Sequence, residues 1–507
     1  MLRIILTLFL SCFCTLPVFA QQKNRVDFLS NLQQAETLKN AQVSFYAKYI
    51  GGKEILVKNE NTLFVPASVL KLYTTAAALE ILGADKTFDT RVYFDGKRKG
   101  SVLQGDIYLL GGGDPSFGSR DFGNKPYYTE IFSSWSEILK KQGIKKINGN
   151  IYADNSIFSG ILLPWRTSYK NIGNYYAPKA DALSIAGNQY TLIFPPTKAG
   201  DKNIMPVSVE PIVRRLVFLS GVYASEKNSN EQVYVTFEPA TNIINLTGTL
   251  PITKERTKVF ASLPNPALFA AESFYDFLRY AGIKVSGKVK IKKGGNYLEK
   301  ELLFVHTSPT LAELVKHTNK RSNNLYAEVL LRDMSAYTEG NGSAKDGLLK
   351  MRRALTALGL EEDDFDIYGA SGLDYTSNVS CRATVTLLES ILNRPYAQIF
   401  KDSLVVAGGE EKSIFGKRVA KKDFASKTIL KTGSLDKARA VAGYTKDKDG
   451  KDIAFCFFIN NFKANQRQIT SLQDNFLEYL SNYKHQEKPD TIQTKTRAKS
   501  HSDKNKK

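Results

Sequence analysis

Helical and strand-like hydrophobic patterns alternate along this 507-residue chain. Residues 42–50 alternate apolar and polar side chains, as does a strand with one buried face. Residues 68–82 instead space their apolar side chains with helical periodicity, and Gly83 is the type of residue at which a helix ends. The pattern therefore predicts strands followed directly by a helix near the N-terminus.

The middle of the chain differs from its two ends. Short strand-like segments dominate residues 88–263, and helical periodicity returns from residue 264. The other expected strands are 54–59, 62–65, 106–110, 149–153, 190–194, 232–237, 427–430, 439–444 and 452–460, and the other expected helices are 128–142, 264–280, 310–318, 325–332, 343–358 and 466–483. We therefore predict a mixed α/β fold, in which one domain (residues 21–87 and 264–483) is interrupted by a β-rich insertion (residues 88–263) of two subdomains.

Both ends of the chain fall outside this domain pattern. Residues 1–20 place one Arg before a short apolar run and end at the small residue Ala20, as a cleaved signal peptide does. A retained membrane anchor is the alternative, but the run is short for a membrane span. Residues 484–507 carry eight Lys or Arg against three Asp or Glu and almost no apolar side chains, which predicts a disordered tail. We expect an exported, periplasmic protein whose tail either contacts anionic envelope surfaces weakly or only aids solubility.

The net charge of +20 does not by itself indicate a nucleic-acid partner. No nucleic-acid recognition module is visible, and an exported protein rarely meets nucleic acid, so none is expected. Only Cys381 and Cys456 follow the signal peptide, and with four His in the chain they are too few and too scattered for a zinc site. We expect both to be buried small side chains, with a bridge between them left open, and we expect no metal or other cofactor.

A serine nucleophile is predicted at Ser68. Lys71 lies one helical turn further along Ser68-Val69-Leu70-Lys71, on the same helix face, where an amine can remove the hydroxyl proton. Ser-x-x-Lys occurs three times in the chain, close to the roughly two occurrences that chance would give. Only Ser68 follows an apolar strand and opens a helix, where backbone N–H groups favour developing negative charge.

Two further motifs follow in order. Ser322-Asn323-Asn324 would supply a second hydroxyl and an amide, although these three residues taken alone also fit a helix-capping turn. Lys431-Thr432-Gly433-Ser434 continues an apolar strand, and Gly433 would let a substrate peptide approach the strand edge. The N–H groups of Ser68 and Ser434 would form the oxyanion hole. The ordered set predicts an active-site serine enzyme.

These segments resemble the class C low-molecular-mass penicillin-binding proteins, serine D-alanyl-D-alanine carboxypeptidases and endopeptidases of bacterial cell walls. The resemblance covers the whole mature chain and is carried by residues 66–71, 111–115, 172–177, 306–309, 319–328, 370–373, 406–409 and 431–434. That family has extra domains between nucleophile and second serine, and here 254 positions separate residue 68 from residue 322. A class A β-lactamase would have a gap several-fold shorter.

The resemblance implies a fold and a chemistry. It implies a penicillin-binding, β-lactamase-like catalytic domain with an antiparallel sheet flanked by helices. Ser68 would be acylated, Lys71 would accept its proton, and Ser322 would protonate the leaving amine. Peptidoglycan stem peptides would be the substrates, and β-lactams would inhibit by acylating the same serine.

The resemblance also implies the binding residues. Asn324 would hold the substrate amide, and Lys431 with Thr432 would bind the terminal carboxylate. Asn323 departs from the family's usual Asp, and Gly369 replaces the acid of the family's Asp-Gly-Ser-Gly-Leu. These departures concern substrate preference, because no catalytic position is lost.

Some questions remain open at this point. Asp154, Asn155 and Trp165 are hypothetical contacts for the side chain of the donor peptide, although surface or core roles fit them as well. A serine β-lactamase, which would hydrolyse its acyl-enzyme quickly, and a catalytically silent wall-binding protein are the alternative functions. The sequence does not rank carboxypeptidase against endopeptidase activity, name the third residue of the stem peptide or fix the oligomeric state.

Overall fold

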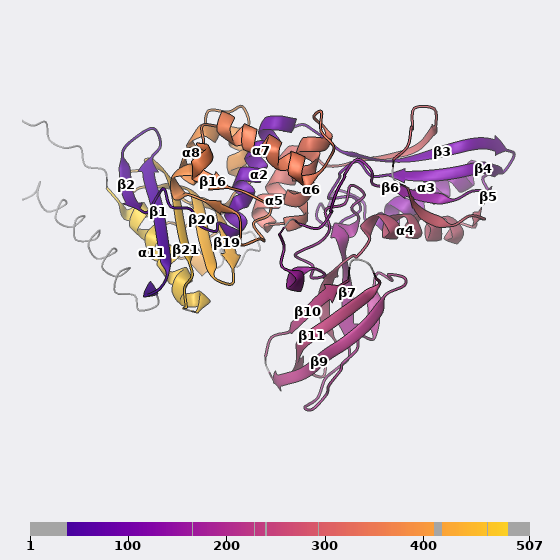
Figure 1. Cartoon of the computed structure of the whole chain (residues 1–507), viewed down its shortest axis with the longest axis horizontal. Helices are drawn as coiled ribbons and strands as arrows, with labels where there is room; N and C mark the ends of the chain where they lie inside the picture. The colour runs from indigo at the N-terminus through magenta and orange to yellow at the C-terminus, as the bar shows by residue number, and fades with distance from the viewer. Residues whose placement is uncertain are drawn as a thin grey trace, which may run out of the picture.

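The structure is a computed structural model that describes residues 38–164, 166–227, 229–238, 241–292, 294–409, 418–463 and 465–484. The expected signal peptide lies outside these ranges, as does the expected tail apart from Lys484. Within them the chain forms antiparallel and mixed sheets covered by helices (Figure 1). This architecture confirms the mixed α/β fold class.

The two ends of the described chain meet in one antiparallel sheet. Across this sheet the strands are β18 (Val405–Val406), β19 (Ile429–Leu435), β20 (Ala438–Lys446), β21 (Asp452–Asn460), β1 (Gln42–Tyr49) and β2 (Glu54–Lys58). Phe45 of β1 pairs with Phe457 of β21, which joins the first strand to the last. Because successive side chains point to opposite faces, Phe45 and its neighbour Tyr46 enter different cores.

Helices cover both faces of this sheet. On the face of Phe45 lies α11 (Gln466–Asn482), whose Phe476 ring centroid is 6.0 Å from that of Phe45. The opposite face packs on a helical layer formed by α2 (Leu70–Leu82), α5 (Leu311–Arg321), α6 (Asn324–Ala336), α7 (Ala344–Ala357), α8 (Cys381–Ile391) and α9 (Ala397–Asp402). The residues of α2 from Leu70 to Leu79 are all buried, as expected for a helix surrounded by others. The short pair β16 (Phe365–Asp366) and β17 (Asn378–Val379) lies in the same part of the chain.

The insertion has its own sheets and core. A seven-stranded sheet contains β3 (Asp89–Lys99), β4 (Val102–Leu110), β5 (Lys146–Ile147), β6 (Ile151–Asp154), β13 (Lys284–Val285), β14 (Val289–Lys292) and β15 (Glu301–Thr307). It shares a core with α3 (Tyr128–Lys141) and α4 (Pro266–Tyr280), in which the rings of Phe132 and Phe274 lie 5.3 Å apart. Two three-stranded sheets form a separate lobe (Figure 1), from β9 (Val217–Lys227), β10 (Gln232–Phe237) and β11 (Ile243–Ile252), and from β7 (Gln189–Phe194), β8 (Ser208–Glu210) and β12 (Thr257–Ser262).

Packing divides the chain differently from the sequence pattern after residue 263. Phe274 of α4 and Phe304 of β15 belong to the core of the insertion, and β15 pairs with β3. We therefore propose that the insertion extends to Thr307, the end of β15. Residues 62–65, expected as a strand, make only an isolated bridge between Phe64 and Val379.

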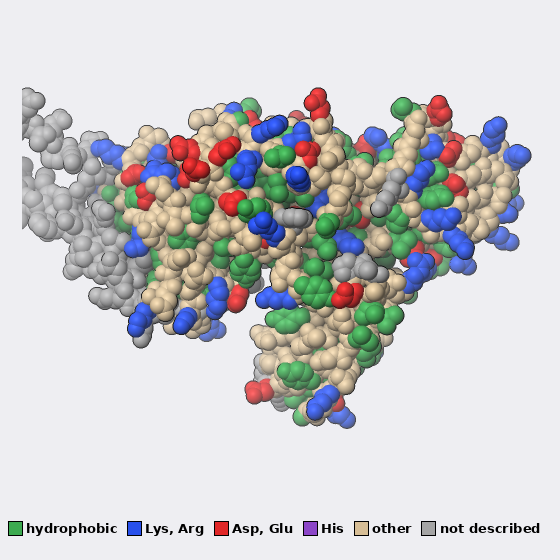
Figure 2. Space-filling view, in the orientation of Figure 1, with side chains coloured by type: hydrophobic (Ala, Val, Ile, Leu, Met, Phe, Trp, Pro, Cys, Tyr) green, Lys and Arg blue, Asp and Glu red, His purple; other side chains and the backbone are tan. Residues whose placement is uncertain are grey.

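The surface and the cysteines add two observations. Basic side chains gather over the end of the seven-stranded sheet that lies away from the sheet of β1 and β21 (Figure 2), where β3 ends in exposed Lys97, Arg98 and Lys99. Cys381 and Cys456 are both buried, as the sequence predicted, and neither forms a disulfide.

Among the helices in the described ranges, none is long and apolar enough to cross a bilayer.

Candidate active site

Ser68 occupies a tight turn at the beginning of α2. A 3₁₀ turn, Ala67–Val69, leads into the helix, and the Ser68 side chain remains half-buried beside it. Ala67 has a φ of 46°, in the left-handed region that non-glycine residues seldom adopt. Such conformations cost free energy and concentrate at functional sites, so the turn is held by its surroundings.

Two glycines allow distant segments to contact this turn directly. A Cβ added to Gly433 would lie 2.6 Å from the Pro66 carbonyl oxygen and 3.0 Å from the Ser68 nitrogen. A Cβ added to Gly372 would lie 1.9 Å from the Ala67 carbonyl oxygen. The absence of side chains therefore brings β19 and the loop around residue 372 against the backbone of the predicted nucleophile.

Lys71 joins the first motif to the second. It is fully buried, and its Nζ lies 3.0 Å from Ser68 Oγ, 2.6 Å from Asn324 Oδ1 and 2.6 Å from the Ser371 carbonyl oxygen. Asn324 Oδ1 and the Ser371 carbonyl can only accept hydrogen bonds, whereas Ser68 Oγ can accept or donate. A neutral amine that donates its two hydrogens to these two acceptors would present its lone pair to Ser68.

Lys431 joins the third motif to the second. Its buried Nζ donates to Ser322 Oγ at 2.9 Å and to the Thr432 carbonyl oxygen at 2.9 Å. Ser322 has a left-handed φ of 56° in the turn between α5 and α6, so a second predicted site residue lies on uncommon backbone. The structure thus brings together the predicted hydroxyls and amines of all three motifs.

Burial lowers the affinity of both lysines for protons. Burial lowers the pKa of Lys71 well below 10.5, the nearby charge of Lys431 lowers it further, and Glu328 opposes both effects. Burial also lowers the pKa of Lys431 to about 7. Lys71 can therefore serve as a base at a pH where an exposed lysine would remain protonated.

The remaining predicted residues surround these groups. Asn324 Nδ2 donates to the Tyr176 carbonyl oxygen at 2.7 Å, which connects the site to the insertion. Along β19, Thr432 is half-buried and Ser434 is exposed, next to the glycine that contacts the nucleophile turn. Asn323 instead caps α6, because its Oδ1 accepts from the Tyr326 N–H. An Asp could accept the same bond, which accounts for the tolerance of Asn at this position.

Sequence reasoning missed two partners of Lys71 and Asn324, the backbone carbonyls of Ser371 and Tyr176. It also missed Glu328, whose buried carboxylate accepts hydrogen bonds from Ala370 and Ser371. A backbone carbonyl leaves no signal in a sequence. Glu328 does leave one, since it lies four residues after Asn324 and therefore on the same face of α6.

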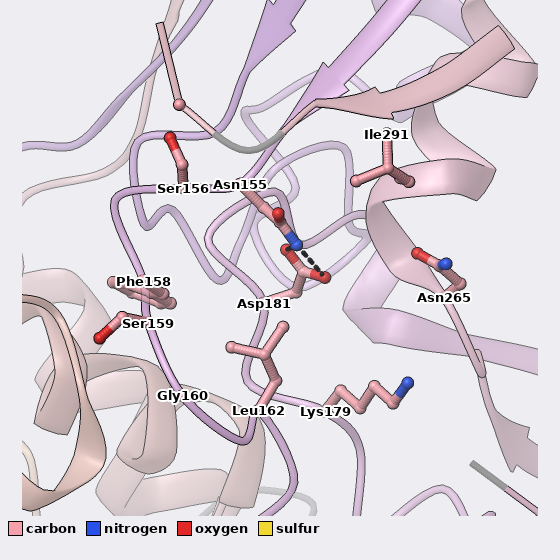
Figure 3. A pocket seen from close by; sticks show the side chains of 11 residues that line it. Asn155, Ser156, Phe158, Ser159, Gly160, Leu162, Lys179, Asp181, Asn265 and Ile291 are labelled. Atoms are coloured by element: carbon pink, nitrogen blue, oxygen red, sulfur yellow. Dashed lines mark hydrogen bonds between the residues drawn. The ribbon is translucent and has the colours of Figure 1, made fainter. Parts of the chain in front are cut away.

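Two of the three hypothetical contacts in the insertion, Asp154 and Asn155, have hydrogen-bond partners within the insertion and its neighbouring segments. Asp154 is buried and accepts hydrogen bonds from Tyr297 and from the Ser156 N–H. Asn155 donates to buried Asp181 at 2.9 Å, at the wall of a cavity of about 480 Å³ (Figure 3). Trp165 lies outside the described residues. Asp154 is thus part of the fold of the insertion.

Comparison with known proteins places nearly the whole described chain in one family. A family model described as the D-Ala-D-Ala carboxypeptidase 3 (S13) family matches residues 25–480. The chain is 28% identical over 457 residues to a D-alanyl-D-alanine carboxypeptidase of Actinomadura sp. (strain R39), covering 87% of this chain and 81% of that protein. It is 26% identical over 461 residues to the D-alanyl-D-alanine carboxypeptidase DacB of Haemophilus influenzae, covering 90% of this chain and 91% of that protein.

The fold also matches a solved structure. The crystal structure of penicillin binding protein 4 (dacB) from Haemophilus influenzae superposes with a TM-score of 0.75 at 24% sequence identity. The match covers 88% of this chain and 97% of that one. Because it extends over the inserted sheets as well as the catalytic sheet, the two proteins share their overall fold.

Proposed function

This chain belongs to the D-Ala-D-Ala carboxypeptidase 3 (S13) family, and on that premise we propose that it hydrolyses peptidoglycan stem peptides through an acyl-enzyme at Ser68. The family makes it a serine-type hydrolase with D-Ala-D-Ala carboxypeptidase activity. The observation that carries the residue assignment is the hydrogen-bond arrangement of Lys71 Nζ, which leaves Ser68 Oγ as the group that can give it a proton.

Acylation begins with proton transfer from Ser68 Oγ to neutral Lys71 Nζ. The Ser68 oxygen then forms a bond to the carbonyl carbon between the two D-Ala residues, and negative charge develops on the carbonyl oxygen. The N–H groups of Ser68 and Ser434 would stabilise this charge, a contribution of about 3 kcal/mol per donor. Gly433 supports this assignment, because its missing side chain lets β19 lie against the Ser68 nitrogen.

The C–N bond breaks when the leaving amine receives a proton. Ser322 Oγ is the donor in this proposal, and Lys431, 2.9 Å away, returns a proton to Ser322. Lys431 regains a proton as Lys71 releases the one it took from Ser68, so Lys71 is neutral and Lys431 is charged again. Water then attacks the acyl-enzyme, Lys71 takes a proton from this water and returns it to Ser68 Oγ, and the shortened peptide leaves. Charged Lys431 and Thr432 would bind the terminal carboxylate of the substrate, and Asn324 its amide.

The penicillin-binding fold makes β-lactams natural probes of this assignment. Wild-type protein incubated with benzylpenicillin should gain the mass of one drug molecule, and Ser68→Ala should gain none. Ser481→Ala is the matched control, because Ser481 and Lys484 form another Ser-x-x-Lys sequence. Ser481 lies in the last turn of α11, and Lys484 follows the helix. Its adduct should equal that of wild type.

The outcomes separate the alternatives. A long-lived adduct that depends on Ser68, together with D-Ala release from a peptide ending in D-Ala-D-Ala, supports the proposal. Rapid loss of the drug without an accumulated adduct would indicate a β-lactamase. Intact drug without an adduct would overturn the nucleophile assignment and favour a silent wall-binding protein. Cleavage of cross-linked muropeptides in the same assay would reveal endopeptidase activity.

We further propose that residues 1–20 direct export to the periplasm and that the basic tail contacts anionic envelope surfaces weakly. The basis is the charge and apolar pattern of those segments. Cell fractionation tests the first point. A chain truncated after residue 483 tests the second, because it should sediment less with anionic lipid vesicles than the mature protein does.

A further inference from the structure

One buried carboxylate lies close to the reacting groups without touching them. Glu328 is on α6, one helical turn after Asn324, and only 2% of its surface is exposed. Its Oε1 accepts hydrogen bonds from Ala370 N–H at 3.2 Å, Ser371 N–H at 3.0 Å and Ser371 Oγ at 2.7 Å. Burying a carboxylate costs free energy unless it is hydrogen-bonded. These hydrogen bonds hold two consecutive residues of one loop in place.

This loop is the one that supplies the third partner of Lys71. The Ser371 carbonyl oxygen accepts from Lys71 Nζ at 2.6 Å. The peptide group between Ala370 and Ser371 is held from both sides. The Ala370 carbonyl oxygen accepts from Thr74 Oγ1 at 2.7 Å, and the Ser371 N–H donates to Glu328. The following Gly372 packs against the Ala67 carbonyl. The loop therefore connects α6 to both the base and the nucleophile turn on α2.

We propose that Glu328 is a positioning residue, which holds the Ser371 carbonyl so that Lys71 keeps its lone pair directed at Ser68 Oγ. The inference rests on the proposed function of Lys71 as the base. The same helix thus controls two of the three contacts of Lys71 Nζ, one directly through Asn324 and one through the loop. Without the Glu328 hydrogen bonds, the loop can move, and the Lys71 amine is free to rotate away from Ser68.

Glu328 also acts on Lys71 through its charge. The charged or titratable groups that face Lys71 are Lys431 from β19 and Glu328 from α6, and they shift the pKa of Lys71 in opposite directions. Glu328 in turn interacts with Arg332 on its own helix, and a Cβ added to Gly369 would lie 3.7 Å from Glu328 Oε1 and 3.0 Å from Asp374 Oδ2, so the Asp374 carboxylate is close by. Because Glu328 raises the pKa of Lys71, removing its charge should lower that pKa and leave Lys71 neutral at lower pH.

Two substitutions separate position from charge. Glu328→Gln keeps an oxygen that can accept the three loop hydrogen bonds but loses the charge. Its second-order rate of acylation by benzylpenicillin should stay near that of wild type at high pH, while the acidic limb of the pH profile moves to lower pH. Glu328→Ala loses the hydrogen bonds as well, and its acylation rate should fall on the order of 10²-fold at every pH.

The control is Glu389→Gln, which neutralises a carboxylate on α8 that pairs with Lys48 at the surface. Its pH profile should coincide with that of wild type. A Glu328→Ala acylation rate within a few-fold of wild type would overturn the positioning role, because the hydrogen bonds to the loop would then not matter. Acidic limbs that coincide for wild type and Glu328→Gln would overturn the contribution of the charge. Should Glu328→Ala fail to fold, Glu328→Gln still decides, because a high-pH rate far below that of wild type would contradict a role that its retained hydrogen bonds preserve. If wild type itself is not acylated at Ser68, the proposed function fails first.

Discussion

The helix α6 borders two buried titratable side chains, Lys71 and Asp333, which differ in how many hydrogen-bond partners they have. At its N-terminal end, Asn324 and Glu328 surround Lys71, whose Nζ has three hydrogen-bond partners. Near its C-terminal end, Asp333 is fully buried, and neither carboxylate oxygen has a hydrogen-bond partner among the described residues. Asp333 faces the glycine-rich segment of the insertion, because a Cβ on Gly113 would lie 2.1 Å from its Oδ1.

The difference shows two ways in which burial changes the protonation of a side chain. At Lys71, burial lowers the pKa of the amine and so favours its neutral form, whose lone pair the two acceptors would direct. At Asp333, burial and the nearby Asp114 carboxylate raise the pKa well above its usual value, which favours the protonated acid. Burial favours the neutral side chain at both sites, but only at the first do hydrogen bonds also direct it at a reacting atom.

Removing the amine of Lys71 is the strongest test of the Lys71 site. Lys71→Met keeps most of the buried volume but has no base, so acylation by benzylpenicillin should fall by up to about 10⁴-fold. Stopped-flow or mass-resolved acylation rates measure this effect. The melting temperature of Lys71→Met shows whether the fold survives, because the apolar side chain removes the cost of burying an amine but leaves Asn324 Oδ1 and the Ser371 carbonyl without this donor. Acylation within tenfold of wild type would show that another group takes the Ser68 proton.

The second-largest loss of acylation rate should come from disturbing the close backbone contact between β19 and the turn that holds Ser68. Gly433→Ala places a methyl group 2.6 Å from the Pro66 carbonyl oxygen and 3.0 Å from the Ser68 nitrogen, so β19 and the nucleophile turn must separate. We expect a loss on the order of 10²-fold in the acylation rate, because both the oxyanion donors and Ser68 shift. Gly450→Ala is a control with no atom within 4 Å of the new Cβ, although its φ of 85° makes that substitution strained too. Its acylation rate should match that of wild type.

The site was more predictable from sequence where its contacts are local or carried by side chains. Ser68 and Lys71 are one turn apart, and the motif order indicated that Ser322 and Lys431 would join them. The third partner of Lys71 could not be predicted, because it is a backbone carbonyl 300 positions away. Its placement depends on how the loop folds against Glu328 and Thr74.

The fold shows the same limit. The strands β1 and β21 were expected because each buries alternate or continuous apolar side chains. The strand β3 was missed, since its last five residues are exposed and polar on both faces and show no period of two. The helix α4 was expected with nearly correct bounds, but its packing against α3 follows from contacts between elements, which periodicity does not encode.

A smaller effect should come from the titration of Lys431. Burial lowers its pKa to about 7, so the free enzyme loses this positive charge as the pH rises through that value. The KM for a peptide with a free terminal carboxylate should then rise by up to about tenfold per pH unit above the pKa, whereas kcat should change less because the bound carboxylate favours charged Lys431. A peptide amide, which lacks that carboxylate, is the control substrate. A similar rise of KM for the amide would contradict the role of Lys431.

A change at Asp333 should affect stability and leave the acylation rate unchanged. Since the folded pKa of Asp333 is raised, the folded protein keeps the Asp333 proton at a pH where the unfolded chain has lost it. The resulting stabilisation is complete below the unfolded pKa of about 4 and is lost as the pH rises through the folded pKa. Burial also raises the pKa of Asp114, to about 6, so the two acids add to the same trend.

Asp333→Asn removes one of these two titrations. Its melting temperature should fall less than that of wild type between pH 5 and pH 8, by about 1 °C for each kcal/mol of the lost linkage. Calorimetry at several pH values measures the two slopes, and the acylation rate at neutral pH serves as the control that α6 is intact. Equal slopes would mean that Asp333 titrates alike in the folded and unfolded chain. Burial would then not raise the pKa of Asp333, and this part of the comparison with Lys71 would be wrong.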